Sequence, residues 1–406
     1  MDPGCVFAPS NEQDVAAALD IVYNTQSTFS VVSGGHMPVP GAQSNDGGVL
    51  ISMHLLNSKE LNEDQSVASI GPGQSWMEVY DWIAVSGLAV AGGRYAPVGV
   101  GGLMVSGGIN YFGNRKGWSV NTLRGAQVVL GNGTVVETSA TENPDLFWAL
   151  KGGSNNYGIV TRYDMATFPV TAAYGGMMMW NGTNATTQFI YALEDFLLSP
   201  EGIEDPDTEI NPTIQVLPQE SGPQYQALIP PFVAGNWDGV PPSVANFTRI
   251  PSPFVNTATQ ENSWVEIPRG INELLSQTGN GQRQMFGSVT SRIAPSIVQL
   301  AVETLLHKAA EDLASVEGIS VALSPEPISE SMLQVAADSG EYAIDLGPED
   351  SGFVSTWNLF LALHILCLCT SLVKHDTYHS YVAVRYMLTI FNLLRYSHAH
   401  KYNMDK

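Results

Sequence analysis

The chain has 406 residues, a formal net charge of -22 and a hydrophobic content of 44%. This length allows two domains or one large α+β unit. The acidic balance argues against a nucleic-acid partner, because phosphate backbones are bound by clustered Lys and Arg. Three cysteines are too few for a disulfide scaffold.

The N-terminal part opens with an apolar run at 5–9, followed by a helix. Ser10 is the expected N-cap of that helix, and Val15, Leu19 and Val22 have the spacing of a buried helical face. Short strands and helices then alternate, which favours an α+β ligand-binding domain. The further expected elements are strands at 29–32, 48–53, 66–70, 88–91 and 158–168, helices at 77–86 and 146–150, and a hairpin over 124–138.

The composition changes after residue 172. Residues 200–260 are rich in Pro, Asn and Thr, with strand-like pieces at 209–217 and 226–233, and 296–315 has the pattern of a long helix. This part is expected to be a separate substrate domain, built on a sheet with helices behind it.

The last stretch differs from the rest of the chain. Residues 359–406 contain no Gly, Pro, Glu, Gln or Trp, although the chain has 39 Gly and 24 Pro. The apolar run at 359–373 is short for a membrane span. Three interpretations stay open: a segment foreign to the ancestral fold, such as a mispredicted exon or a frameshift; a C-terminal helical hairpin; or a membrane anchor.

Two glycine-rich segments carry the strongest functional signal. Ser33-Gly34-Gly35-His36 directly follows the expected strand at 29–32, and the second segment runs over 92–108. Glycines this dense let backbone amides approach a phosphate-bearing ligand without a Cβ in the way. The second segment lacks the last glycine of a nicotinamide fingerprint, which favours another dinucleotide. The turn itself needs only the glycines, so the histidine is free for another task.

These segments resemble the FAD-linked oxidases of the berberine-bridge-enzyme-like family, within the vanillyl-alcohol-oxidase superfamily. The matching motifs lie in the same order and spacing at 31–36, 97–102, 106–112 and 143–161. The resemblance is dense over 5–172 and thinner to about 358. The form Gly-Gly-Ile-Asn-Tyr-Phe is similar to that of fungal members, many of which act on specialised metabolites.

The resemblance implies an α+β fold in two parts. A two-subdomain PCMH-type FAD-binding domain is expected at 1–172, followed at 173–358 by an α+β substrate domain with an antiparallel sheet. The atypical tail at 359–406 is expected to stand outside this fold.

The resemblance also implies the cofactor and its site. In the family the histidine of the first loop bonds to the 8α-methyl group of the flavin, and His36 is the matching residue. Some members add a second bond from a cysteine, but that position is Tyr95 here, so a monocovalent FAD is expected. The family's usual Asp-Asn reads Asn121-Thr122. The expected cofactor-binding residues are Ser33, Gly34, Gly35, His36, Gly99, Gly101, Gly102, Gly107, Gly108, Asn110, Gly158 and Val160.

The implied reaction is oxidation of a small organic substrate by hydride transfer to the flavin, with O2 as the expected re-oxidant. The late Tyr-containing motifs of the family are absent, and no residue is nominated as the catalytic base. Two alternatives stay open: a flavin-fold protein that has lost catalysis and only binds, and an oxidative cyclase. No membrane partner is expected, and the oligomeric state is left open.

Other motifs carry less weight. The glycosylation sequons at Asn132, Asn181, Asn184 and Asn246 hint at a secretory history, although no signal peptide is visible, and the localisation stays open between the secretory pathway and the cytoplasm. His54 is expected to be structural. His375 and His379 have a helical i, i+4 spacing without a carboxylate pattern, so no metal site is expected.

Overall fold

The computed structural model describes residues 2–37, 39, 41–276, 283–316, 318–340 and 342–361. Residues Met1–Leu363 form one compact unit. The tail beyond residue 361, with His375 and His379, lies outside the described residues, so the expectations for it stay predictions.

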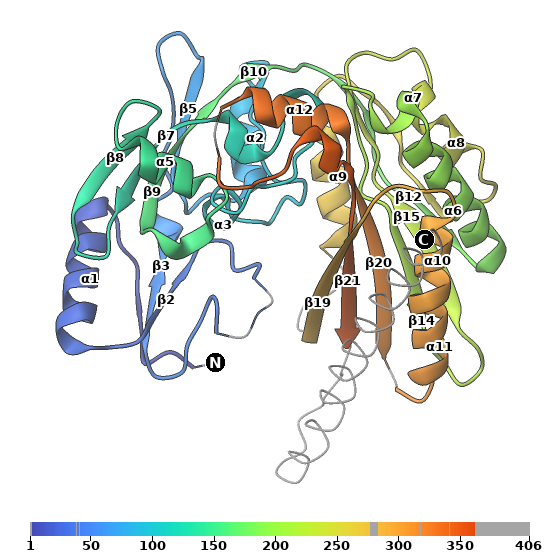
Figure 1. Cartoon of the computed structure of the whole chain (residues 1–406), viewed down its shortest axis with the longest axis horizontal. Helices are drawn as coiled ribbons and strands as arrows, with labels where there is room; N and C mark the ends of the chain where they lie inside the picture. Colours follow the sequence, from blue (N-terminus) through green and yellow to red (C-terminus); the bar gives the residue numbers. More distant parts are fainter. Residues whose placement is uncertain are drawn as a thin grey trace, which may run out of the picture. The chain divides into compact units, whose positions relative to one another are not determined.

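The N-terminal part contains a small parallel sheet and a larger antiparallel one (Figure 1). The parallel sheet has the order β1-β3-β2, with β1 at Cys5–Phe7, β2 at Phe29–Val32 and β3 at Val49–Ser52. The antiparallel sheet has the order β4-β5-β9-β7-β8. Its strands are β4 (Lys59–Leu61), β5 (Val67–Ile70), β7 (Leu123–Val129), β8 (Val135–Ser139) and β9 (Ile159–Ala166).

The first helix, α1 (Glu12–Thr25), buries the expected apolar face. The expected N-cap was wrong: Asn11 caps the helix by accepting from the Asp14 backbone N–H at 2.9 Å. Ser10 instead donates its hydroxyl to the Asp14 carboxylate at 2.7 Å. Two adjacent residues with capping side chains compete here, and the one nearer the helix reaches the free amide.

The remaining helices and short strands of this part connect the two sheets. The helix α2 (Trp76–Ala84) starts with a capping box between Ser75 and Glu78 and buries Trp76 completely. The other elements are β6 (Leu88–Ala89), α3 (Val100–Leu103), α4 (Gly113–Lys116), η2 (Ser119–Thr122), α5 (Pro144–Leu150), η3 (Ser154–Asn156) and β10 (Phe168–Pro169).

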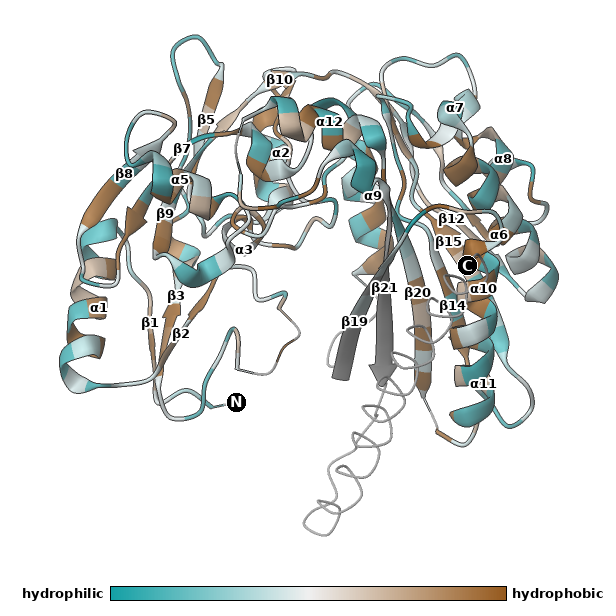
Figure 2. Ribbon diagram, in the orientation of Figure 1, coloured by the Kyte–Doolittle hydropathy of each residue, from teal (hydrophilic) through white to brown (hydrophobic). Residues whose placement is uncertain are grey.

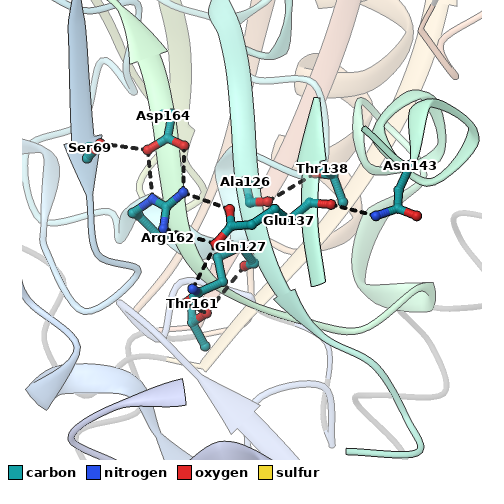
Figure 3. Close-up of polar contacts among 9 residues, drawn as sticks. All are labelled: Ser69, Ala126, Gln127, Glu137, Thr138, Asn143, Thr161, Arg162 and Asp164. Carbon is teal, nitrogen blue, oxygen red and sulfur yellow. Dashed lines mark hydrogen bonds and ion pairs between the residues drawn. The ribbon is translucent and has the colours of Figure 1, made fainter. Parts of the chain in front are cut away.

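One polar network ties three strands of the antiparallel sheet together on a single face (Figure 3). Arg162 on β9 pairs with Glu137 on β8 at 2.8 Å and with Asp164 at 2.8 Å. The Ser69 hydroxyl on β5 donates to Asp164 at 2.6 Å. Arg162 and Asp164 are two residues apart on one strand, so their side chains share a face. The side chains of the network are partly exposed, so their ion pairs add little to stability, and their main effect is to fix one another's orientation.

The second part is built on two antiparallel sheets. The larger has the order β17-β12-β15-β14-β20-β21-β19, and the smaller has the order β13-β16-β11-β18. The strands are β11 (Ala173–Gly175), β12 (Met178–Asn181), β13 (Thr208–Glu209), β14 (Thr213–Leu217), β15 (Gln224–Ile229), β16 (Phe232–Ala234), β17 (Val255–Asn256), β18 (Thr259–Glu261), β19 (Arg283–Ser291), β20 (Ile319–Ile328) and β21 (Gly352–Leu361). This arrangement confirms the expected α+β fold with an antiparallel sheet.

The helices of the second part cover one face of the large sheet in Figure 1. They are α6 (Thr183–Leu198), α7 (Pro200–Ile203), α8 (Ala245–Thr248), α10 (Ile297–Ala301), the π-helical turn η5 (Val302–His307) and α11 (Lys308–Asp312). The last three form the long helix expected at 296–315, interrupted by the π turn. The elements α9 (Glu266–Leu275) and α12 (Glu330–Asp338) pack elsewhere in the unit.

Two expected strands are split in the structure. The piece at 209–217 divides into β13 and β14, and the piece at 226–233 divides into β15 and β16. Pro212 lies in the first break and Pro230-Pro231 in the second. Proline has no backbone N–H for the strand ladder, so each run ends there and its halves join different sheets.

An aromatic cluster joins the N-terminal part to the second part. Phe232 on β16 lies 4.5 Å from Tyr111 and 5.5 Å from Phe112, measured between ring centroids. Trp264 lies 4.9 Å from Tyr80, on the N-terminal side. These rings belong to one buried core, which includes residues of both parts. Figure 2 shows apolar residues concentrated along the strands, with polar stretches on the outer helices.

Among the residues that the structure describes, no helix is both long and apolar enough to cross a bilayer.

We expect Phe232→Ala to lower the free energy of unfolding by about 3–5 kcal/mol, because it leaves a cavity in the aromatic cluster. Phe232 is 0% exposed. Phe254→Ala is the control, since that ring is 50% exposed and its loss should cost about 0.5 kcal/mol or less. Urea unfolding measures both variants, and equal losses would contradict a shared core.

Candidate active site

The two glycine-rich segments meet backbone to backbone. A Cβ at Gly34 would overlap the backbone nitrogen of Gly99, and a Cβ at Gly99 would overlap that of Gly34. Only glycine allows this approach, so each residue is required by the other. The loop after β2 and the segment leading into α3 therefore form one surface, although 65 residues separate these two glycines in the sequence.

Ser33 fastens this junction with its side chain. Its hydroxyl donates to the Pro72 carbonyl at 2.5 Å and accepts from the Gly101 backbone N–H at 3.3 Å. The Tyr163 hydroxyl on β9 donates to the Gly101 carbonyl at 2.8 Å. The antiparallel sheet thus holds the second glycine segment through Tyr163 on β9. The Ser33 hydroxyl is already hydrogen-bonded within the protein.

Two other glycines leave open space where the loops meet. A Cβ at Gly102 would have no heavy atom within 4 Å, and one at Gly35 would meet nothing closer than a Gln43 side-chain oxygen at 3.4 Å. Gly35 also has a φ of +68°. Packing within the protein does not demand a glycine at Gly102. This free backbone fits a dinucleotide such as FAD, whose phosphates need amides unobstructed by side chains.

His36 lies beside Tyr95 at the mouth of these loops. The two rings meet edge to face, with centroids 5.6 Å apart and planes at 77°. The residue His36 is exposed, and its ring makes no hydrogen bond to any of the described residues. Partial desolvation of the ring lowers the pKa of His36, which favours the neutral imidazole with a free lone pair. Such an imidazole is a competent nucleophile.

The second glycine pair follows α3 and turns the chain sharply. Gly107 and Gly108 have φ values of +102° and +81°. Asn110 is completely buried, donating to the Gly117 carbonyl at 2.9 Å and accepting from the Phe112 backbone N–H at 2.9 Å. Its side-chain amide therefore holds the next turn in place.

The remaining expected cofactor residues lie on and before β9. A Cβ at Gly158 would crowd the Val129 carbonyl at 2.7 Å. Val160 is buried and pairs with Val128 of β7. Its side chain belongs to the core, and its backbone lies in the strand ladder with β7.

His54 and the asparagines of the four glycosylation sequons lie outside the two glycine loops. His54 lies in a short 3-10 helix after β3, with its ring nitrogen 3.0 Å from the Ser52 hydroxyl. Asn132, Asn181 and Asn184 are exposed, and Asn246 is partly exposed.

A buried ion cluster next to Tyr95 was not anticipated from the sequence. Arg94 pairs with Glu209 on β13 at 2.6 Å and with Glu326 on β20 at 2.8 Å. The side chains of these three residues are only 12%, 11% and 9% exposed. The Arg94 carbonyl also accepts from the Tyr111 hydroxyl at 2.6 Å. One arginine of the N-terminal part is thus held by two strands of the second part.

The two glycines before Arg94 explain its position. A Cβ at Gly92 or Gly93 would overlap the indole of Trp76, and the Tyr80 hydroxyl donates to the Gly93 carbonyl at 2.8 Å. The backbone of Gly92 and Gly93 therefore packs directly against the Trp76 indole, and the next residue, Arg94, extends toward the second part. The sequence holds a weak signal for this, the Gly-Gly-Arg triplet, but the two glutamates lie more than 100 residues away.

The cluster also has unusual protonation. Burial raises the pKa of Glu209 to about 8; the Arg94 charge opposes the rise, and Glu326 adds to it. The pKa of Glu326 is raised for the same main reason. Burial thus favours the protonated form of both carboxyl groups, whereas the Arg94 charge favours their ionised form.

Comparison with known protein families identifies the N-terminal part. A family model described as an FAD binding domain matches residues 3–139. The chain is 35% identical over 353 residues to the FAD-dependent monooxygenase prx3 of Penicillium roqueforti, covering 85% of this chain and 67% of that protein. It is 30% identical over 364 residues to the bifunctional solanapyrone synthase of Alternaria solani, covering 88% and 67%. The chain thus spans about two thirds of the length of these relatives.

Solved structures share the fold. The 6-hydroxy-D-nicotine oxidase of Arthrobacter nicotinovorans superposes with a TM-score of 0.70 at 21% identity, covering 88% of this chain and 75% of that one. The xylooligosaccharide oxidase of Myceliophthora thermophila gives 0.69 at 21% identity, with 90% and 76% covered. The berberine bridge enzyme of Eschscholzia californica gives 0.69 at 16% identity, with 96% and 75% covered.

We expect Gly102→Ala and Gly99→Ala to fail in different ways. Gly102→Ala should keep the free energy of unfolding of the FAD-free protein within about 0.5 kcal/mol, but weaken FAD binding. Gly99→Ala should also lower that free energy by about 1–3 kcal/mol, because its Cβ collides with the first loop.

Urea unfolding and FAD titration measure the two effects, and Gly131→Ala, which has open space around it, is the control. Unchanged FAD affinity in Gly102→Ala would contradict the assignment of this backbone to the cofactor.

We expect Arg94→Met to lower the free energy of unfolding by about 3–5 kcal/mol, because it leaves two buried carboxyl groups without their cation. Arg249→Met is the matched control, since that arginine is exposed and bonds only to Asn246 at 2.9 Å among the described residues. A loss no larger than the control's would show that the cluster is not a stabilising link.

The raised pKa of Glu209 predicts a pH dependence. The folded state keeps a proton that the unfolded state has already released, so the free energy of unfolding should fall from about pH 5 to about pH 8. Glu209→Gln should remove most of that fall. Urea unfolding across this range measures both proteins, and parallel curves would contradict a protonated Glu209.

Proposed function

Because the chain belongs to the FAD-linked oxidoreductases of the berberine-bridge-enzyme-like, PCMH-type FAD-binding family, we propose that it oxidises a small organic substrate, with O2 as the final electron acceptor. A bound FAD would supply the two-electron redox chemistry, with the substrate giving up a hydride and O2 leaving as H2O2 after taking up two electrons and two protons. The observation that carries the proposal is the junction of the two glycine loops, with His36 and Tyr95 at its mouth.

Within this proposal His36 holds the flavin by a single covalent bond. Its imidazole nitrogen would replace one hydrogen of the 8α-methyl group of the flavin, and O2 would take up the two electrons and two protons released, forming H2O2. The backbone around Gly35 and Gly102 would supply amides for the phosphates. The bond keeps the cofactor in one orientation against the substrate domain. Tyr95 stands where a cysteine would make a second bond, and a phenol packed edge-on against His36 instead fixes the plane of the imidazole.

The substrate is proposed to be an intermediate of specialised metabolism. The similarity to solanapyrone synthase of Alternaria solani supports this class, since it extends over 88% of the chain. That relative is described as bifunctional, which favours an oxidative cyclase as the second candidate. A flavin protein without catalysis is the remaining alternative.

We expect His36→Ala to release the flavin when the protein is denatured. Acid precipitation separates free from bound flavin, and the absorbance of the pellet measures the bound fraction. His54→Ala, at the other histidine near the N-terminal sheet, should leave the flavin in the pellet. Flavin that stays attached in His36→Ala would refute the covalent link without touching FAD binding itself.

Anaerobic mixing with candidate metabolites tests the oxidase proposal. Bleaching of the flavin absorbance near its visible maximum, followed by recovery and H2O2 release on admitting air, is the expected result. A cyclase would in addition convert the oxidised product into a ring-closed isomer. The isomer would differ from the oxidised product in chromatographic retention time but have the same molecular mass. Bound flavin that no candidate reduces would favour the binding-only alternative.

A further inference from the structure

A pocket with basic and neutral polar side chains adjoins the second glycine segment through η2, whose Ser119 and Val120 N–H groups donate to the Gly108 and Gly107 carbonyls at 2.8 and 3.0 Å. Its volume is about 380 Å³, and it is lined by residues of α4, η2, the start of β7, the turn from β9 to β10, and α12. None of its lining residues belongs to 33–36, to 92–108 or to the Arg94 cluster. In Figure 1 the labels α12 and β10 stand together at the upper edge, whereas β2, which leads into the first glycine loop, lies low in the view.

The pocket gathers positive charge in a strongly acidic protein. Arg115, Lys116 and Arg124 all line it, although the chain has only 17 Lys and Arg against 39 Asp and Glu. Arg115 pairs with Asp207. Arg124 is exposed and pairs with no carboxylate among the described residues. Three cations with one counter-charge leave an excess of positive charge in the pocket.

Lys116 is the central cation of the three. Its ammonium lies 4.5 Å from the centroid of the Phe168 ring, and the lysine stem is partly buried. Burial lowers the pKa of Lys116, and the neighbouring charges of Arg115 and Arg124 lower it further. The three groups repel one another, and an anion placed between them would relieve that repulsion. The carboxylate of Asp338 on α12 accepts from Gln334 at 2.8 Å.

The neutral polar side chains of the pocket are already hydrogen-bonded within the protein. Asn121 accepts from the Trp118 backbone N–H and donates to the Ser339 hydroxyl, both at 2.8 Å. The Thr122 hydroxyl donates to the Ser119 carbonyl at 2.8 Å. The free donors are therefore those of the cations. Guanidinium and ammonium groups arranged around a small volume recognise compact oxyanions, above all phosphate.

We propose that the basic pocket formed by Arg115, Lys116 and Arg124 binds a phosphate-type oxyanion, separately from the flavin site. The ligand is inorganic phosphate or the phosphate group of a small metabolite. Arg124 provides the forked donors from the exposed side, and Lys116 provides the point charge at the base. A bound oxyanion would neutralise the positive charges of α4 and β7. It would thereby hold these two elements together, next to the turn before β10.

The test is a phosphate titration of the full chain loaded with FAD, followed by the shift in thermal unfolding. The ionic strength is held constant with sodium chloride. We expect saturable stabilisation by inorganic phosphate, and a Kd at least about tenfold weaker in Arg124→Gln. Arg124 is exposed, so this variant keeps the fold. Lys116→Gln should weaken binding similarly, and Arg249→Gln, at an exposed arginine elsewhere, should match the parent protein.

Three results would overturn the proposal: an equal shift with chloride alone, an unchanged Kd in both Arg124→Gln and Lys116→Gln, or a phosphate response that appears only in the FAD-free protein. The last would assign the pocket to the flavin site. A parallel titration with glycerol phosphate identifies the source. Binding of the monoester as tight as that of phosphate supports a metabolite ligand, and its exclusion supports free phosphate.

Discussion

The site depends on the contact between Gly34 and Gly99. Neither residue can carry a side chain, because each occupies the space where the Cβ of the other would lie. This single constraint brings the loop after β2 against the segment before α3, and Ser33 and Tyr163 then hold the segment from two sides. The open backbone at Gly102 and the position of the His36 imidazole both follow from it. Without the close approach, the two loops would be separate turns.

A second set of contacts places the second part of the chain against these loops. The aromatic cluster around Phe232 buries apolar surface between the N-terminal part and the second part. The ion cluster of Arg94, Glu209 and Glu326 fixes the orientation of one part against the other. Apolar contacts tolerate sliding, whereas a buried arginine held by two carboxyl groups has one geometry. The combination fixes where β13 and β20 end relative to Tyr95.

Much of the fold and part of the site follow from local sequence. The strand at Phe29–Val32 was predicted with its observed bounds, since an apolar β-branched run before Ser33 is a short-range signal. The division of 209–217 and 226–233 was missed, because which sheet each half joins depends on distant partners. The Arg94 cluster was missed for the same reason. Asn110 was expected to serve the cofactor, and only the fold shows its amide bonded to Gly117.

Arg94 and Tyr95 are consecutive, so the strands of the second part are connected mechanically to the ring beside His36 through one peptide unit. A hinge motion that drew β13 and β20 away from the N-terminal sheets would strip the guanidinium of both carboxyl groups. Breaking a buried pair of this kind costs several kcal/mol. A movement of β13 or β20 that kept these ion pairs would therefore carry Arg94 and the adjoining Tyr95 with it.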